Sequence, residues 1–229
     1  MSDRLPILLT GATGLVGMAV IAAAAQDPRS ELAALARRPA DLPPGARLEM
    51  LVADPADWPA AIGRARPHSI AIAIGTTIGD QGGDRAAFRA IDHDLALMVA
   101  RAARAAGARQ AILVSSAGAS AASRNFYLSV KGEVEAGIAA LRFPRFDILR
   151  PGMLIGARHG RPRPAERVGQ ILSPIIDPLL LGRLSAYRSV RAGDMGAAIL
   201  MLSRLSALGR HVHDAMAIRA LAKDWRATI

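Results

Sequence analysis

A tyrosine and a lysine four residues apart, Tyr127 and Lys131 in the run FYLSVKGEVE, form the pattern that most directly indicates chemistry. The chain has two tyrosines, and only two of its 29 basic residues are lysines. Positions i and i+4 share one face of a helix, so both side chains would point the same way. An ammonium group can lower the pKa of a neighbouring phenol and still donate other hydrogen bonds. The pair therefore indicates proton transfer, and the alternative is an ordinary amphipathic helix.

Two serines precede this pair at the end of the apolar run AILVSSAGAS. Ser116 lies 11 residues before Tyr127, where its hydroxyl could hold the carbonyl or alcohol oxygen of a substrate. Taken alone, a serine here is more often a cap or a turn residue. In combination with Tyr127 and Lys131, we interpret Ser116 as the residue that binds the substrate oxygen, with Ser115 as its neighbour.

A glycine-rich loop, TGATGLVG, follows the first apolar run and opens a helix-length segment. Its GxxGxxG spacing permits a tight turn, a close approach of backbone to a pyrophosphate, and close packing of helix on strand. The pyrophosphate would lie at the helix N-terminus, where free N–H groups favour an anion. The alternative is a tight turn without a ligand. The cofactor contacts predicted in this loop are Gly11, Thr13, Gly14, Leu15, Val16 and Gly17.

The second apolar run ends in Arg37 and Arg38 instead of the acid that binds an adenosine ribose diol. Arginine can accommodate the 2′-phosphate of NADP, so this pair favours NADP(H) over NAD(H). The alternative is two solvated arginines in an arginine-rich chain. Further cofactor contacts are predicted where the later strands end. They are Asp54, at the adenine edge, and Gly75, Thr76, Thr77 and Ser115.

Short apolar runs alternate with Ala-rich, helix-length segments, which predicts an α/β fold with a doubly wound parallel sheet, the Rossmann fold. The expected strands are 5–10, 31–36, 48–52, 69–75, 110–115 and 146–150. The expected helices are 14–25, 58–64, 85–106 and 125–141, followed by a helix near 194–203 and a short strand near 211–214. We expect one domain over 1–229, in which 152–210 forms a small C-terminal cap on the substrate side.

Composition restricts the classes of function. The net charge of +10 comes from arginines spread along the chain without a nucleic-acid-binding module, which favours a small anionic ligand over nucleic acid. The absence of cysteine excludes disulfides and thiolate catalysis. The five histidines lack metal-ligand spacing, so no metal site is expected. Without a signal-peptide pattern or an uninterrupted apolar run of about 20 residues, the chain is predicted to be soluble and cytoplasmic and not to bind membranes.

Several charged residues are expected to be solvated instead of functional. Asp92 and Asp94 would lie at the exposed start of a helix, and Glu133 and Glu135 on a solvated helix face. The arginine-rich segment 158–167 is interpreted as a surface loop, with anion binding as the alternative.

The runs TGATGLVG, SSAGA, YLSVK and LRPGMLIG resemble the short-chain dehydrogenase/reductase superfamily in its atypical or extended branch. The run from Ser115 to Gly156 is similar to small bacterial oxidoreductases of the Tat-interacting-protein type, often described as nucleoside-diphosphate-sugar epimerase-like. The resemblance implies Tyr127 as general acid/base, Lys131 as the cation that tunes it and binds the ribose, and Ser116 as the ligand of the substrate oxygen.

The same resemblance implies that Pro151 and Gly152 shape the wall beside the nicotinamide. The sequence departs from the family at Asp92, where many relatives carry an asparagine that completes a proton relay.

The leading hypothesis is an NAD(P)-dependent oxidoreductase that transfers a hydride between nicotinamide and a small carbonyl or alcohol substrate, as a monomer or homodimer. One alternative is a nucleoside-diphosphate-sugar epimerase, for which the 77 residues after Gly152 leave little room. Another is a non-enzymatic NADPH-binding regulatory protein, which would not need the complete set of Ser, Tyr and Lys.

Overall fold

A seven-stranded, fully parallel sheet forms the centre of the molecule, in the order β3-β2-β1-β4-β5-β6-β9. The computed structural model describes residues 6–156, 180 and 182–229. The strands of the sheet are β1 (Ile7–Thr10), β2 (Leu32–Ala36), β3 (Glu49–Val52), β4 (Ser69–Ile72), β5 (Gln110–Val114), β6 (Arg145–Leu149) and β9 (Gly209–His213). A separate parallel pair joins β7 (Leu154–Ile155) to β8 (Val190–Arg191).

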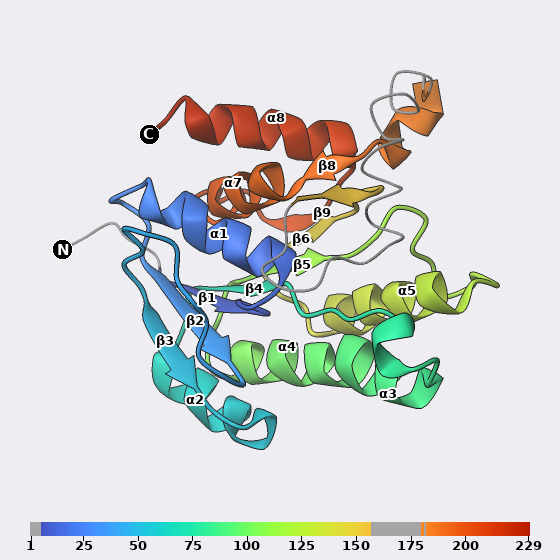
Figure 1. Ribbon diagram of the computed structural model, residues 1–229, viewed down its shortest axis with the longest axis horizontal. Coiled ribbons are helices and arrows are strands. Elements are labelled where there is room, and N and C mark those ends of the chain that lie inside the picture. Colours follow the sequence, from blue (N-terminus) through green and yellow to red (C-terminus); the bar gives the residue numbers. More distant parts are fainter. Residues whose placement is uncertain (1–5, 157–179, 181) are drawn as a thin grey trace.

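Helices cover both faces of the sheet, which gives three layers (Figure 1). One face carries α1 (Leu15–Ala25) and α7 (Ala192–Leu202), with α8 (Ala215–Arg226) packed on α7. The other carries α2 (Trp58–Ala65), α4 (Ala96–Ala105) and α5 (Phe126–Ala140). One continuous helical stretch runs from α3 (Arg85–Arg89) through the π-helical turn η3 (Ala90–Leu95) into α4. Short 3-10 turns are η1 (Pro55–Asp57), η2 (Gly79–Gln81) and η5 (Gly182–Tyr187).

Two apolar cores lie on the two faces of this sheet. Because helices cover both faces, the central strands are buried throughout, as the all-buried run Ile7–Thr10 shows. One core joins α1, α7 and α8 to the sheet and includes Trp225 of α8. The other joins α2, α4 and α5. Fully buried Phe88 of α3 packs on Phe126, at the start of α5.

The chain reverses its direction across the sheet between β1 and β4. From β1 it proceeds outward to β2 and β3, then returns to place β4 on the other side of β1. In doubly wound sheets, ligands bind outside the carboxyl ends of the strands at such a switch point. The residues after Thr10 and after Ile72 are therefore where a ligand is expected.

The predicted Rossmann fold is confirmed, and the expected strands and helices occur within three residues of the predicted bounds. The prediction missed α8, η5 and the β7–β8 pair, and β9 is a full seventh strand beside β6. Within the predicted cap, α7 belongs to the helical layer that packs on α1. The arginine-rich segment 158–167 lies outside the described residues. In the described part of the chain, no helix is both long and apolar enough to cross a bilayer.

Candidate functional site

The glycine loop turns the chain directly from β1 into α1. Gly11 has φ +81°, and a Cβ there would come within 2.4 Å of the Ala73 carbonyl oxygen after β4. A Cβ on Gly17 would lie 2.1 Å from the Gly11 carbonyl oxygen. Both positions therefore require glycine. Gly14 precedes α1 and supplies no side-chain cap, which leaves the first-turn N–H groups facing the loop.

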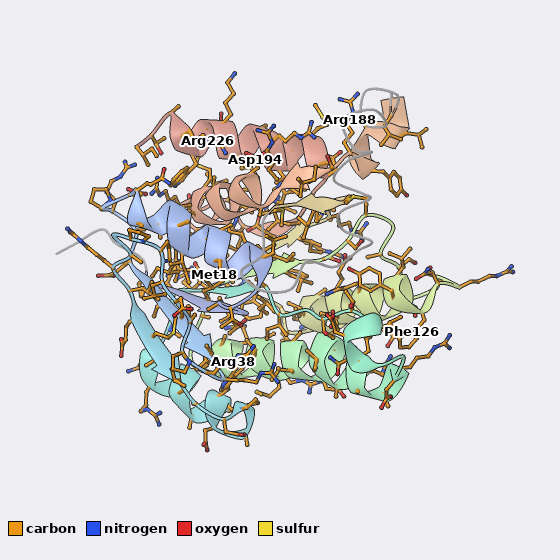
Figure 2. The ribbon with its side chains drawn as sticks, viewed as in Figure 1. Met18, Arg38, Phe126, Arg188, Asp194 and Arg226 are labelled. Carbon is orange, nitrogen blue, oxygen red and sulfur yellow. The ribbon has the colours of Figure 1, made fainter. Side chains whose placement is uncertain are left out.

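A pocket opens beside this loop at the switch point. Its walls come from the glycine loop, the end of β2, the segment after β4, and η3. The lining residues are Gly11, Ala12, Thr13, Gly14, Leu35, Ala36, Arg37, Arg38, Trp58, Ala73, Ile74, Gly75, Ile91 and Leu95. The structure thus brings six predicted cofactor residues together: Gly11, Thr13, Gly14, Arg37, Arg38 and Gly75. Arg38 lies at the end of β2, and Phe126 marks the start of α5 (Figure 2).

The tyrosine and lysine lie in the first two turns of α5. Asn125 caps this helix, and its side-chain oxygen accepts from the Leu128 N–H at 3.1 Å. The centre of the buried Phe88 ring lies 6.0 Å from the centre of the Tyr127 ring, so the two rings pack together. The Lys131 Nζ lies 5.8 Å from the centre of the Tyr127 ring. Among the described residues, the Tyr127 hydroxyl has no hydrogen-bond partner.

Asp92 was expected at the exposed start of a helix, and this prediction is wrong. The residue lies within η3 and is only 1% exposed. Its Oδ1 lies 2.8 Å from Lys131 Nζ, and its Oδ2 accepts from the Thr76 N–H at 2.7 Å. A Cβ built on Gly75 would lie 3.6 Å from this Oδ1 and 3.8 Å from Lys131 Nζ. The ion pair therefore lies beside the wall of the pocket, although the polar neighbours of Asp92 in the sequence had favoured a solvated helix start.

The prediction of a solvated Glu135 is wrong as well, because this carboxylate is only 2% exposed. The Ser115 hydroxyl donates to its Oε1 at 2.6 Å, and the Arg150 guanidinium donates to both oxygens, at 2.9 and 2.5 Å. The hydrogen bond with Glu135 raises the pKa of Arg150 above its ordinary value. Ser116 is half-buried, and its hydroxyl makes one long contact, 3.4 Å to the Ala117 carbonyl. Of the two serines, Ser116 is the one whose hydroxyl is available to a ligand.

The other predicted residues lie in local contacts. The Asp54 carboxylate caps η1 through the Ala56 N–H and does not line the pocket. The side-chain oxygens of Thr76 and Thr77 accept from Gln81 and from the Asp80 N–H, respectively.

Just after β6, the backbone lies in close contact with the loop that follows Ser116 and with η5. The Pro151 carbonyl accepts from the Ala117 N–H at 2.8 Å, which ties the loop after Ser116 to β6. Gly152 lies so close to η5 that a Cβ would come within 2.0 Å of the Tyr187 carbonyl oxygen.

The histidines in the described residues do not gather into a ligand set, and no three acidic or histidine side chains there could hold a metal ion. His211 and His213 stack at 6.4 Å between ring centres. His213 Nε2 lies 2.9 Å from the fully buried Asp147, so this residue packs into a structural network.

Sequence relatives place the chain in a family. Residues 11–167 match the NAD(P)H-binding family. The mitochondrial protein fmp52 of Emericella nidulans is 37% identical over 174 residues, which cover 73% of this chain and 74% of the relative. The mitochondrial protein FMP52 of Saccharomyces cerevisiae is 38% identical over 154 residues, 66% of each chain.

Solved structures agree with this placement at the level of the fold. MoeE5 in complex with UDP-glucuronic acid and NAD superposes with a TM-score of 0.70 at 14% identity, covering 92% of this chain and 76% of that protein. WbmG of Bordetella bronchiseptica in complex with NAD gives 0.66 at 18% identity, covering 98% and 79%.

These findings correct one prediction and confirm another. The prediction of a cytoplasmic protein is contradicted, because the relatives at 37 to 38% identity are named as mitochondrial proteins. The resemblance to atypical short-chain dehydrogenases is confirmed by the matched family and by neighbours with the epimerase-like fold. With a GxxGxxG loop at the switch point of a Rossmann sheet, this chain belongs to the NAD(P)H-binding family, alongside the Fmp52 proteins.

Proposed function

We propose that the chain is an NADPH-dependent oxidoreductase that acts on a carbonyl or alcohol substrate, with Tyr127 as the general acid/base. The observation that carries the proposal is the position of Lys131. Its Nζ lies 3.8 Å from the Cβ position of Gly75, a residue of the candidate cofactor pocket, and 5.8 Å from the centre of the Tyr127 ring. A proton-transferring pair next to a dinucleotide pocket supports redox chemistry at carbon.

The residues at the pocket fit a dinucleotide. Gly11 and Gly17 give a compact loop, and the uncapped N-terminus of α1 offers N–H groups to a pyrophosphate. Arg37 and Arg38 line the same pocket and would bind a 2′-phosphate on the adenosine ribose, which is the basis for proposing NADP(H) over NAD(H). The bound nicotinamide would supply or accept the hydride.

The protein's own part in the reaction is proton transfer and positioning. The Tyr127 hydroxyl would give its proton to a carbonyl oxygen during reduction, or take one from an alcohol during oxidation. The Lys131 ammonium group, paired with Asp92 at 2.8 Å, has three N–H donors and would bind a ribose hydroxyl and stabilise the phenolate. The Ser116 hydroxyl would donate to the substrate oxygen. Since the chain carries a net charge of +10, an anionic substrate is favoured.

The test is NADPH oxidation against a panel of aldehydes and ketones, with wild type, Tyr127→Phe and Ser129→Ala. Loss of the phenolic proton donor should lower kcat by about a hundredfold or more. The Kd for NADPH, from fluorescence titration, should stay within about threefold, since the ring remains. Ser129→Ala is the matched control, because it removes a hydroxyl from the same helix that only contacts the Phe126 carbonyl. Turnover by Tyr127→Phe at the wild-type rate would remove Tyr127 from the mechanism.

The same assay separates the two other functions. An epimerase would co-purify with NAD that does not exchange, and would leave added NADPH unconsumed. A regulatory protein would bind NADPH without turnover on any substrate of the panel. Either outcome would exclude the proposed oxidoreductase.

A further inference from the structure

The ion pair between Asp92 and Lys131 is the most deeply buried pair of opposite charges at the candidate site. The Asp92 side chain is 0% exposed and that of Lys131 is 8% exposed, with 2.8 Å between Oδ1 and Nζ. The second carboxylate oxygen is held by the Thr76 N–H at 2.7 Å. Three segments, η3, α5 and the chain after β4, therefore meet at one carboxylate.

Asp92 owes this position to a local departure from α-helical geometry. It lies in η3, a π-helical turn between α3 and α4. Such turns inside α-helices are frequent at functional sites. Two residues further along, Asp94 returns to the surface with a side chain that is 65% exposed, so burial is specific to Asp92.

The other charged groups near this part of α5 are engaged with one another. Glu133 pairs with Arg89, Asp94 with His93, and Glu135 with Arg150. Among the described residues, Asp92 is thus the one carboxylate within ion-pair distance of Lys131.

A buried ion pair is weak evidence for stability, because desolvation of both charges offsets most of their attraction. A pair of this kind can instead restrict where a flexible side chain lies. Lys131 has four rotatable side-chain bonds, and without a fixed partner its ammonium group would sample several positions. The ion pair with Asp92, with 2.8 Å between Nζ and Oδ1, instead fixes the ammonium group between the Gly75 wall of the pocket and the Tyr127 ring.

We propose that Asp92 is a positioning residue, which acts on the reaction through Lys131 by holding its ammonium group between Tyr127 and the cofactor pocket. This inference rests on the proposed function and adds to it a residue that touches neither cofactor nor substrate.

The experiment compares Asp92→Asn, Asp94→Asn and Lys131→Met with wild type, using NADPH and a carbonyl substrate that wild type reduces. Asp92→Asn should lower kcat about tenfold or more while KM for the substrate changes less than about threefold, because the loss is in orientation and charge. Asp94→Asn is the matched control, since it removes an exposed carboxylate from the same turn, and should equal wild type. In the Lys131→Met background, Asp92→Asn should change neither the residual rate nor the Kd for NADPH.

Independent effects of the two substitutions, which multiply in the double variant, would overturn the positioning role, as would a wild-type kcat in Asp92→Asn. If Asp92→Asn does not fold, Asp92→Glu takes its place, because it keeps the charge but displaces it by one methylene, and should again lower kcat more than it changes KM. Loss of folding in both variants would assign Asp92 to the core and overturn the inference. Absence of turnover in wild type would refute the proposed function. The Kd for NADPH would then test the link between Asp92 and Lys131, because Asp92→Asn should raise it about threefold or more alone and leave it unchanged in the Lys131→Met background.

Discussion

The Ser115 hydroxyl donates to Oε1 of Glu135 across 2.6 Å, in a site where both side chains are almost completely buried. Arg150, the last residue before the Pro151 turn, binds the same carboxylate through two nitrogens. The three residues come from the end of β5, the middle of α5 and the end of β6. They therefore join the helix that carries Tyr127 to the carboxyl ends of β5 and β6.

Glu135→Gln should destabilise the protein because Arg150 and Ser115 would lose their charged partner inside the fold. Breaking a fully buried pair costs about 3–5 kcal/mol, and because the Arg150 side chain is 30% exposed we expect a smaller cost, about 2–3 kcal/mol. Urea denaturation measures this change. Glu133→Gln, two residues earlier on the same helix, breaks a partly exposed pair with Arg89 and should cost less, about 1 kcal/mol. Equal losses in the two variants would show that Glu135 does not hold the strands.

The stability of the protein should fall in acid through Asp147. Burial by itself would raise the pKa of this carboxyl, but hydrogen bonds from His213, Arg145 and Gln110 together bring it below its ordinary value. The folded-state pKa thus lies below that of the unfolded chain. The carboxylate contributes its full stabilisation above about pH 4, and this is lost as the pH falls through the folded value.

Asp147→Asn should therefore cost about 3–5 kcal/mol at pH 7, because Arg145 would be left without its buried partner. Urea denaturation of both proteins at pH 7, 5 and 3 should show the difference in unfolding free energy becoming smaller below pH 4. A difference that stays constant down to pH 3 would mean that Asp147 is not the group that titrates.

The sequence predicted the fold well because its determinants are local. The strands β1, β2, β4 and β5 are largely apolar runs of four or five residues, and Ala-rich segments fill the intervals. Asp214 caps α8, yet α8 was missed because its Ala-rich run AMAIRALAKDWR follows a weak strand signal. The glycine loop was also predictable, because the spacing of its glycines reflects a close approach between backbone atoms a few residues apart, such as those of Gly11 and Gly17.

Charged side chains in helices were the least predictable part. Asp92 and Glu135 were expected on solvated surfaces, because their neighbours in sequence are polar. Their partners, Lys131 and Arg150, come from other elements, and only the packing of α5 against η3 and β6 brings these charges together. Burial of a carboxylate depends on such distant partners, which no local pattern reveals.

Gly17→Ala should disrupt the cofactor loop. Its Cβ would lie 2.1 Å from the Gly11 carbonyl oxygen, so the loop or the start of α1 must shift. We expect a loss of about 1–3 kcal/mol in unfolding free energy and a rise of about tenfold or more in the Kd for NADPH. Gly63→Ala is the control, since Gly63 lies in α2 with open space around its Cβ position, and should stabilise by about 0.5–1 kcal/mol. Unchanged NADPH binding by Gly17→Ala would argue against the glycine loop as the pyrophosphate site.

The proposed preference for NADPH should depend on Arg37 and Arg38. Both arginines line the pocket at the end of β2, and a hydrogen bond to a charged group contributes about 1.5–3 kcal/mol. Replacing both with serine should raise the Kd for NADPH by about ten- to a hundredfold or more, while the Kd for NADH stays within about threefold. Arg47→Ser, which removes an exposed arginine outside this pocket, should leave both constants unchanged. Fluorescence titration with the two dinucleotides measures all four values. Equal weakening of NADH and NADPH binding would mean that the arginines shape the pocket generally, because only NADPH carries the 2′-phosphate that they are proposed to bind.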